Sequence, residues 1–335
     1  MTWRNDMSIV SVRGLTKVYR SYVREPGLRG ALRSFFSRQQ HAKTAVDSLD
    51  FEIQSGEIVG FLGPNGAGKT TVIKMLSGIL HPTSGQAWVM GFVPWERRKQ
   101  MKLRLSVVMG QKQQLWWDLP ARESLRLNQY IYELPADKFN RAVAELCELM
   151  AVNDLLGVPV RQLSLGERMK FELIAALVHE PRLIFLDEPT IGLDILAQKR
   201  ILEFLKNVNQ ARKTTILLTS HNLMDIQKLC PRVIIINRGR LVSDGRLADL
   251  CHVLEQKKII RIETSQPMLV EDLQRLGDVR EFDPYRARVE VSREAVRECA
   301  AILFARQAIT DINIEDIPLE ENLERIFAQE ALKVA

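Results

Sequence analysis

Short apolar runs alternate with helix-forming runs along two parts of the chain, and a block of helical patterns separates those parts. Before the block, the pattern predicts strands at 9–12, 49–53, 57–62, 86–90 and 105–109, with a helix at 72–80. The block, about 112–178, contains helical patterns at 123–132, 137–150 and 167–177. Strands at 183–186, 214–219 and 233–237 then alternate with helices at 195–208 and 223–229. We therefore predict an α/β fold whose core is interrupted by a helical subdomain.

A second pattern begins near residue 246. Strands are predicted at 258–264, 279–282, 287–291 and 309–316, and helices at 268–276 and 294–306. This βαββαβ order is most simply a small ferredoxin-like α+β domain. At 335 residues the chain is long enough for two domains. We assign residues 1–245 to the first and residues 246–335 to an accessory domain.

The apolar runs and the cysteines indicate where in the cell the protein is expected. The longest apolar runs fall far short of the roughly 20 residues that a membrane-spanning helix needs, and residues 1–12 lack the apolar stretch of a secretory signal. We expect the protein to stay on the cytosolic side. The four cysteines, at 147, 230, 251 and 299, lack metal-ligand spacing, which favours reduced, packed thiols.

The net charge of +6 is unevenly distributed. A basic insertion at residues 20–43 has Glu25 as its single acid. Its apolar residues follow helical spacing, so it is either an amphipathic helix that contacts an anionic membrane surface or a partner, or an insertion that packs on its own domain. A second basic run, 97–104, is interpreted as solvated surface. No nucleic-acid-binding module accompanies either run, and no nucleic acid partner is expected. The apolar residues of the basic insertion that follow this helical spacing are Leu28, Leu32, Phe35 and Phe36.

A glycine-rich turn between a strand and a helix is the strongest chemical signal. It fits G-x-x-x-x-G-K-[ST], in which backbone N–H groups and the helix dipole attract a phosphate. Lys69 would contact the β and γ phosphates, and Thr70 would bind Mg²⁺ through its hydroxyl. The loop and the residue after it are Gly63, Pro64, Asn65, Gly66, Ala67, Gly68, Lys69, Thr70 and Thr71.

Two carboxylates end the apolar strand at 183–186. Ligands of open α/β sheets bind at the carboxyl ends of the strands. Asp187 fits a residue that holds Mg²⁺ through its water shell, and Glu188 fits a general base for the water that attacks the γ phosphate.

The motif Leu163-Ser164-Leu165-Gly166-Glu167, followed by a helix, resembles the signature of ATP-binding cassette (ABC) proteins. The other motifs of that family stand in matching order over residues 7–245. The resemblance implies a P-loop NTPase fold with a RecA-like core, ATP hydrolysis with Mg²⁺, and nucleotide contacts from Ser164 and Gly166. It further implies a Q-loop glutamine that also reaches the metal, a D-loop aspartate, a switch histidine and an aromatic residue that stacks on adenine. These match Gln111, Asp194, His221 and Tyr19, respectively.

Each of these carried-over residues has an alternative. Tyr19 is either the adenine-stacking residue or a packed surface aromatic. The Q-loop register is open between Gln111 and its neighbours Gln113 and Gln114, although the strand end favours Gln111. Asp194 fits a helix cap as well as a site residue. His221 is either a structural histidine or the residue that contacts the γ phosphate, which its place at a strand end favours.

The signature departs from the usual L-S-G-G-Q at two positions. Leu165 excludes some glycine-only conformations. Glu167 would place a carboxylate near ATP, unless it points away or stabilises the N-terminus of the following helix.

The family resemblance implies that two cassettes close head to tail around ATP, so we expect a homodimer or a paired partner cassette. In ABC transporters the helical subdomain contacts an integral membrane permease subunit. Trp116 and Trp117 are either an anchor for that contact or a pair buried within the subdomain. The competing class is a soluble ABC ATPase that acts on ribosomes or DNA, but the helical block is too short for a long coiled coil.

The segment Ile312–Leu323 is similar to the tails of ABC-2 type ATPases, the group that resembles daunorubicin-resistance and sodium-export proteins. This resemblance implies an export ATPase that lies peripherally on the cytoplasmic face of the membrane. The substrate pathway would lie in the permease.

Overall fold

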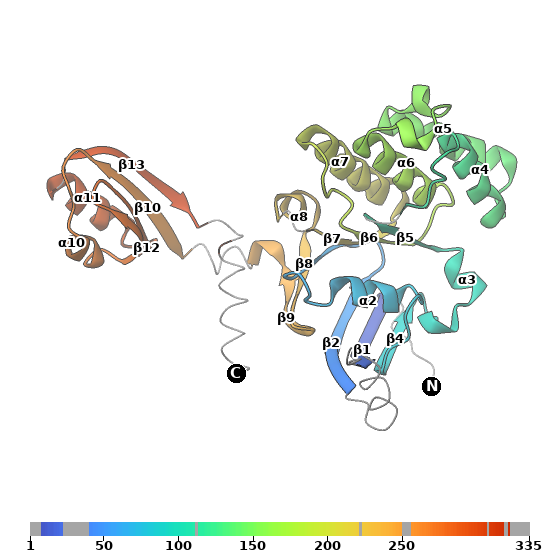
Figure 1. The fold of residues 1–335 in the computed structure, drawn as a ribbon, viewed down its shortest axis with the longest axis horizontal. Helices are drawn as coiled ribbons and strands as arrows, with labels where there is room; N and C mark the ends of the chain where they lie inside the picture. Colours follow the sequence, from blue (N-terminus) through green and yellow to red (C-terminus); the bar gives the residue numbers. More distant parts are fainter. Residues whose placement is uncertain are drawn as a thin grey trace, which may run out of the picture. The chain divides into compact units, whose positions relative to one another are not determined.

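The computed structural model describes residues 8–22, 40–110, 113–220, 223–249, 256–306, 308–317 and 321. The chain divides into two compact units, Met1–Asp244 and Gly245–Ala335 (Figure 1). In the part of the chain that is described, no helix has both the length and the apolar character needed to cross a bilayer. Three cysteines, Cys147, Cys230 and Cys299, are buried and free, in agreement with packed thiols, and burial raises the pKa of each thiol.

A six-stranded sheet forms the centre of the first unit, in the order β5-β6-β7-β3-β8-β9. Neighbouring strands from β5 to β8 are parallel. Every residue of β3, β6 and β7 is buried, as expected for a parallel sheet covered on both faces. The strands are β3 (Ile58–Leu62), β5 (Leu105–Met109), β6 (Leu183–Asp187), β7 (Thr215–Thr219), β8 (Arg232–Asn237) and β9 (Arg240–Arg246).

A second, antiparallel sheet has the order β2-β1-β4. Its strands are β1 (Ser8–Tyr22), β2 (Gln40–Gln54) and β4 (Ser84–Val89). The predicted strands at 9–12 and 49–53 were therefore too short, because β1 and β2 pair far beyond their buried segments. Both ends of the basic insertion belong to this pairing, whereas its predicted amphipathic helix lies outside the described residues.

Helix α2 (Lys69–Leu76) lies between these two sheets (Figure 1). Its buried residues join one apolar core with both sheets, in which the rings of Phe51 and Phe61 lie 5.8 Å apart. The basic run at 97–104 includes the short helix α3 (Lys99–Lys102), and its basic side chains are exposed as predicted. The other α-helices in the described part of this unit are α4 (Ala121–Ile131), α5 (Ala136–Met150), α6 (Leu165–Leu177), α7 (Ile195–Arg212) and α8 (Leu223–Leu229).

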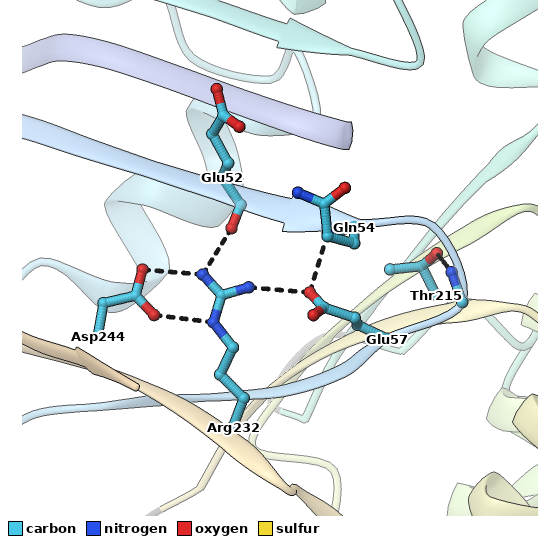
Figure 2. A network of polar contacts seen from close by, with 7 residues as sticks. Glu52, Gln54, Glu57, Thr215, Arg232 and Asp244 are labelled. Atoms are coloured by element: carbon cyan, nitrogen blue, oxygen red, sulfur yellow. Dashed lines mark hydrogen bonds and ion pairs between the residues drawn. The ribbon is translucent and has the colours of Figure 1, made fainter. Parts of the chain in front are cut away.

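A polar network closes the sheet at the end of β3 that is opposite the glycine-rich loop (Figure 2). The Arg232 guanidinium donates to the Glu57 carboxylate at 2.9 Å, to the Glu52 carbonyl at 2.8 Å and to both oxygens of Asp244 at 2.8 and 2.9 Å. The hydrogen bonds to Asp244 contribute most to raising the pKa of Arg232. The Arg232 side chain, on β8, thus bonds to β2, to β9 and to the residue directly before β3.

The second unit has the predicted βαββαβ order and an antiparallel sheet in the order β11-β12-β10-β13. This is the ferredoxin-like arrangement, with Ile260, Val289 and Leu303 in a common core. The elements are β10 (Lys257–Thr264), α10 (Val270–Gln274), β11 (Asp278–Asp283), β12 (Arg286–Ser292), α11 (Val296–Arg306) and β13 (Ile309–Asp316).

Candidate nucleotide-binding site

The glycine-rich loop connects β3 to α2 and is held closely by its neighbours. Gly68, immediately before α2, has φ of 108°. A Cβ atom there would lie 2.4 Å from the Ala45 carbonyl oxygen, and one at Gly63 would lie 2.3 Å from the Ile236 carbonyl oxygen. Only glycine fits these two positions, so the backbone of β2 and β8 fixes the path of the loop.

Lys69 is buried at the first position of α2. Its Nζ donates to the carbonyl oxygens of Gly63 at 2.6 Å and Pro64 at 3.2 Å. Burial lowers its pKa, while the negative charges of Glu188 and Asp187 oppose that change. The ammonium group is thus held inside the loop, where the motif requires a cation for phosphate oxygens.

Thr70 and Asp187 meet at the carboxyl ends of the central strands. Thr70 Oγ1 donates to Asp187 Oδ2 at 2.8 Å, and Thr219 Oγ1 donates to Asp187 Oδ1 at 2.8 Å. Hydroxyl and carboxylate oxygens are the hard donors that Mg²⁺ prefers. The donor set fits a magnesium site, in which Thr70 and Asp187 would hold the ion and the ion would neutralise phosphate charge.

Glu188 occupies a strained backbone position directly after β6. Its φ is 58°, which is uncommon for a residue with a side chain. Its N–H donates to the Thr219 carbonyl at 3.1 Å, and a Cβ atom at Gly110 would lie 2.5 Å from the Glu188 carbonyl oxygen. The residues at the ends of β5 and β7 therefore fix the backbone of this turn.

The signature residues Ser164 and Glu167 form a capping box at the start of α6. Glu167 Oε2 accepts from the Ser164 N–H at 2.9 Å and from Ser164 Oγ at 2.8 Å, and the Glu167 N–H donates to Ser164 Oγ at 3.3 Å. This geometry favours the helix-capping interpretation of Glu167, because S-x-x-E is the sequence of a capping box.

The signature lies close to the D-loop and to the start of α7 within one chain. Leu165 Cδ2 lies 3.2 Å from the position of a Cβ at Gly192, and a Cβ at Gly166 would lie 3.2 Å from Ala197 Cβ. Asp194 caps α7 by accepting from the Ala197 N–H at 2.9 Å. Asp194 therefore has the capping role, and its nucleotide contact stays a prediction.

The other predicted residues lie around this centre. The side chain of Tyr19, on β1, is partly exposed, and Lys17 Nζ lies 5.6 Å from its ring centroid. The exposed surface of the Tyr19 ring leaves room for a stacked base. Gln111 and His221 fall outside the described residues. Each directly follows a described residue that comes after a strand of the six-stranded sheet, Gly110 after β5 and Ser220 after β7.

The structure adds polar residues that the motifs did not indicate. Thr219 bonds to Asp187 and lies directly beside it in the register of β6 and β7. The signal in the sequence was its position as the last residue of the predicted strand at 214–219. Thr190 Oγ1 donates to Asp225 Oδ2 at 2.7 Å, and both residues are buried. This second pair joins the turn after Glu188 to α8, which follows His221 in the chain.

The two tryptophans of the helical subdomain are exposed, with 57% of Trp116 and 44% of Trp117 accessible. The alternative of a buried pair is therefore wrong. The Trp117 ring lies beneath the Arg168 guanidinium, at 4.9 Å from the ring centroid. Leu115, the residue before them, supplies the buried contact instead.

Comparison with known proteins identifies the family. Residues 46–191 match the ABC transporter family. The chain is 32% identical over 291 residues to the linearmycin resistance ATP-binding protein of Bacillus subtilis, which covers 85% of this chain and 93% of that relative. This chain belongs to the ABC transporter ATP-binding protein family. Residues 256–315 match the C-terminal domain of EvrA-like ABC transporters.

Other ABC proteins are also similar to this chain. The Nod factor export ATP-binding protein I of Burkholderia pseudomallei is 35% identical over 76% of this chain and 80% of its own. A solved ATP-binding subunit of an ABC transporter is 25% identical, with a TM-score of 0.60 over 73% of this chain and 92% of that one. A dimeric ATP-binding cassette bound to ADP and phosphate, 21% identical, has the same fold, with a TM-score of 0.59 over 71% and 98%.

These findings confirm the family predicted from the motifs. The ABC chain is an ATP-binding and ATP-hydrolysing transporter subunit. The soluble ATPase of ribosomes or DNA is not supported by the relatives, which are named for resistance and export.

Proposed function

We propose that two copies of this ABC chain close head to tail around two ATP molecules and drive an exporter of the ABC-2 type. The observation that carries this proposal is the meeting of Thr70, Asp187 and Thr219 beside a loop whose lysine faces inward. In one copy, Lys69 and the loop amides bind the phosphates, Thr70 and Asp187 hold Mg²⁺, and Glu188 accepts the proton of the attacking water. Ser164 of the second copy completes the site.

The remaining assignments follow from the same arrangement. Gln111 and His221 would lie at the ends of β5 and β7, which flank β6 and its two carboxylates. We assign Gln111 to the metal and His221 to the γ phosphate. Tyr19 is assigned to adenine, since it lies on the strand that pairs with β2 beside the loop.

A membrane permease is the proposed partner on the helical subdomain. Trp116 and Trp117 are exposed close to the Q-loop, so a permease segment that covers them would respond to movement at the nucleotide. The chain would then lie on the cytoplasmic face of the membrane. Relatives named for linearmycin resistance and Nod factor export support the outward direction of transport.

The test is to purify tagged Glu188→Gln protein from detergent-solubilised source cells, with ATP present, and to identify what accompanies it. We expect a polytopic membrane protein in roughly equal amount, because a pair of cassettes needs a pair of permease halves. Trp116→Ala/Trp117→Ala in the same background should release that protein while ATP binding is retained. Recovery of ribosomes or DNA without a membrane protein would contradict the proposal.

A further inference from the structure

A buried carboxylate on α6 has no role in the chemistry described above. Glu172 is 4% exposed and lies about two helical turns after Ser164, on the helix that begins at the signature. Its Oε1 accepts the backbone N–H of Gln114 at 2.9 Å and that of Leu115 at 3.3 Å. A charge taken out of water in this way needs such partners.

The segment that Glu172 holds is the exit of the Q-loop. Residues 113–116 form neither helix nor strand. Gln114 Nε2 donates to the Val107 carbonyl of β5 at 2.7 Å, and the Trp116 N–H donates to Ser124 Oγ of α4 at 2.9 Å. Side chains of α6 and α4 therefore accept hydrogen bonds from the backbone N–H groups of three successive residues, 114–116, shortly after Gln111.

Arg168 adds a second link between the same two segments. It lies one turn before Glu172 on α6, and its guanidinium covers the ring of Trp117. Burial raises the pKa of Glu172, while the two backbone hydrogen bonds and the charge of Arg168 oppose that change. The helix thus holds the backbone at 114 and 115 through a carboxylate and the side chain at 117 through a cation.

We propose that Glu172 is a positioning residue that makes the Q-loop exit move together with the signature helix. The inference rests on the proposed roles of Gln111 and Ser164. A movement of α6 on nucleotide binding would pass through this carboxylate to residues 114 and 115, and so to the exposed tryptophans beside them. Glu172 acts only through the residues it holds and does not touch the reacting atoms.

Two substitutions distinguish the effect of the length of the Glu172 side chain from the effect of its charge. Glu172→Gln keeps the length of the side chain and an acceptor oxygen, whereas Glu172→Asp keeps the charge but is one methylene shorter. We expect Glu172→Asp to lower kcat for ATP roughly tenfold while KM changes less than about twofold, and Glu172→Gln to stay within about twofold in both. Glu172→Ala should resemble Glu172→Asp, because it leaves the two N–H groups without their acceptor.

The second readout is amide hydrogen exchange of residues 113–116 in the full chain, with and without ATP, in a Glu188→Gln background. ATP should slow this exchange in the parent protein and in Glu172→Gln, but not in Glu172→Asp. This comparison does not depend on turnover. Glu148→Asp, an exposed carboxylate on α5, is the matched control and should behave as the parent.

The results distinguish failure of the Glu172 role from failure of the proposed function. If Glu172→Gln is as impaired as Glu172→Asp, or if ATP-dependent protection persists in Glu172→Asp, the positioning role is wrong. If the unsubstituted chain neither binds nor hydrolyses ATP, the proposed function itself has failed. A variant with a lowered thermal midpoint is compared through the exchange measurement at a temperature where it remains folded.

Discussion

Thr70 and Asp187 stand 117 positions apart in the chain, yet Thr70 Oγ1 donates a hydrogen bond to Asp187 Oδ2 at 2.8 Å. The contact joins the first turn of α2 to the end of β6. It places one hydroxyl and one carboxylate beside the loop that is proposed to bind phosphate, so the candidate site is assembled by the topology of the parallel sheet.

Removal of the Thr70 hydroxyl should weaken the use of Mg²⁺. We expect Thr70→Ala to lower ATP turnover at least about tenfold and to raise the Mg²⁺ concentration needed for half-maximal rate, since one oxygen ligand is lost. Thr70→Ser keeps the hydroxyl and should remain within a few-fold. Phosphate release measured across a Mg²⁺ titration tests this, and equal titration curves for alanine and serine would refute it.

Glu188→Gln should abolish turnover but leave nucleotide binding intact. Loss of the general base is expected to cost about 100-fold or more in rate. The ATP-bound dimer should persist, because its phosphate ligands are unchanged. Light scattering after size exclusion, with and without ATP and Mg²⁺, reports the dimer, and Lys69→Ala is the control that loses it. A Glu188→Gln chain that stays monomeric with ATP would contradict the mechanism.

Glu167→Gln should leave the ATPase rate within a few-fold of the parent. Glutamine forms the same capping box with Ser164, in which the side chain accepts the Ser164 N–H. Glu167→Ala removes this cap and should reduce the free energy of unfolding by about 1 kcal/mol. Steady-state kinetics with thermal unfolding checks both variants. A loss of about 100-fold in Glu167→Gln, the size expected for a general base, would give this carboxylate a direct chemical role.

The buried side chain of His179 should make the folded protein less stable in acid. Its ring stacks on Tyr132 at 3.6 Å between centroids, and burial lowers its pKa to about 4 from 6.5. Well above pH 6.5 the residue is neutral in the folded and unfolded states. As the pH falls from 6.5 towards 4, the unfolded chain takes up a proton that the folded chain excludes, so stability decreases by up to roughly 3 kcal/mol.

The measurement is denaturant unfolding of the parent and of His179→Gln at several pH values between 7 and 4. The difference between the two proteins isolates this histidine from the carboxylates that titrate in the same range. The parent should lose more stability than the variant. Parallel pH curves would show that His179 is protonated in the folded protein as readily as in the unfolded one.

The chemical motifs and the buried strands could be predicted because their information is local. The run at 183–186 is wholly apolar and ends in Asp187, and the glycine loop stands between a strand and a helix pattern. The βαββαβ order was equally visible. The outer halves of β1 and β2 and the strand β9 were not, because their polar and exposed side chains lack the alternation that marks a half-buried strand.

Contacts between residues that are far apart in the sequence could not be predicted either. Glu172 reaches Gln114 across 58 positions, and no motif connects them. The partner of Glu167, by contrast, is three residues away and fits a known capping pattern, so its role was among the alternatives considered. The predictions for Gln111 and His221 stand as made, since those residues lie outside the described part.

The two ends of the β1–β2 pairing differ in how closely they pack against the glycine-rich loop. At the inner end, Val46 is fully buried and the Ala45 carbonyl lies against Gly68, so a change there would reach the phosphate loop. Farther along the same strands, Lys43 and Thr44 are exposed opposite Tyr19 and Val18. Substitutions in the outer part of this pairing should therefore leave the loop in place, which makes Thr44, exposed and paired with Val18, the natural position for attaching a fluorescent reporter.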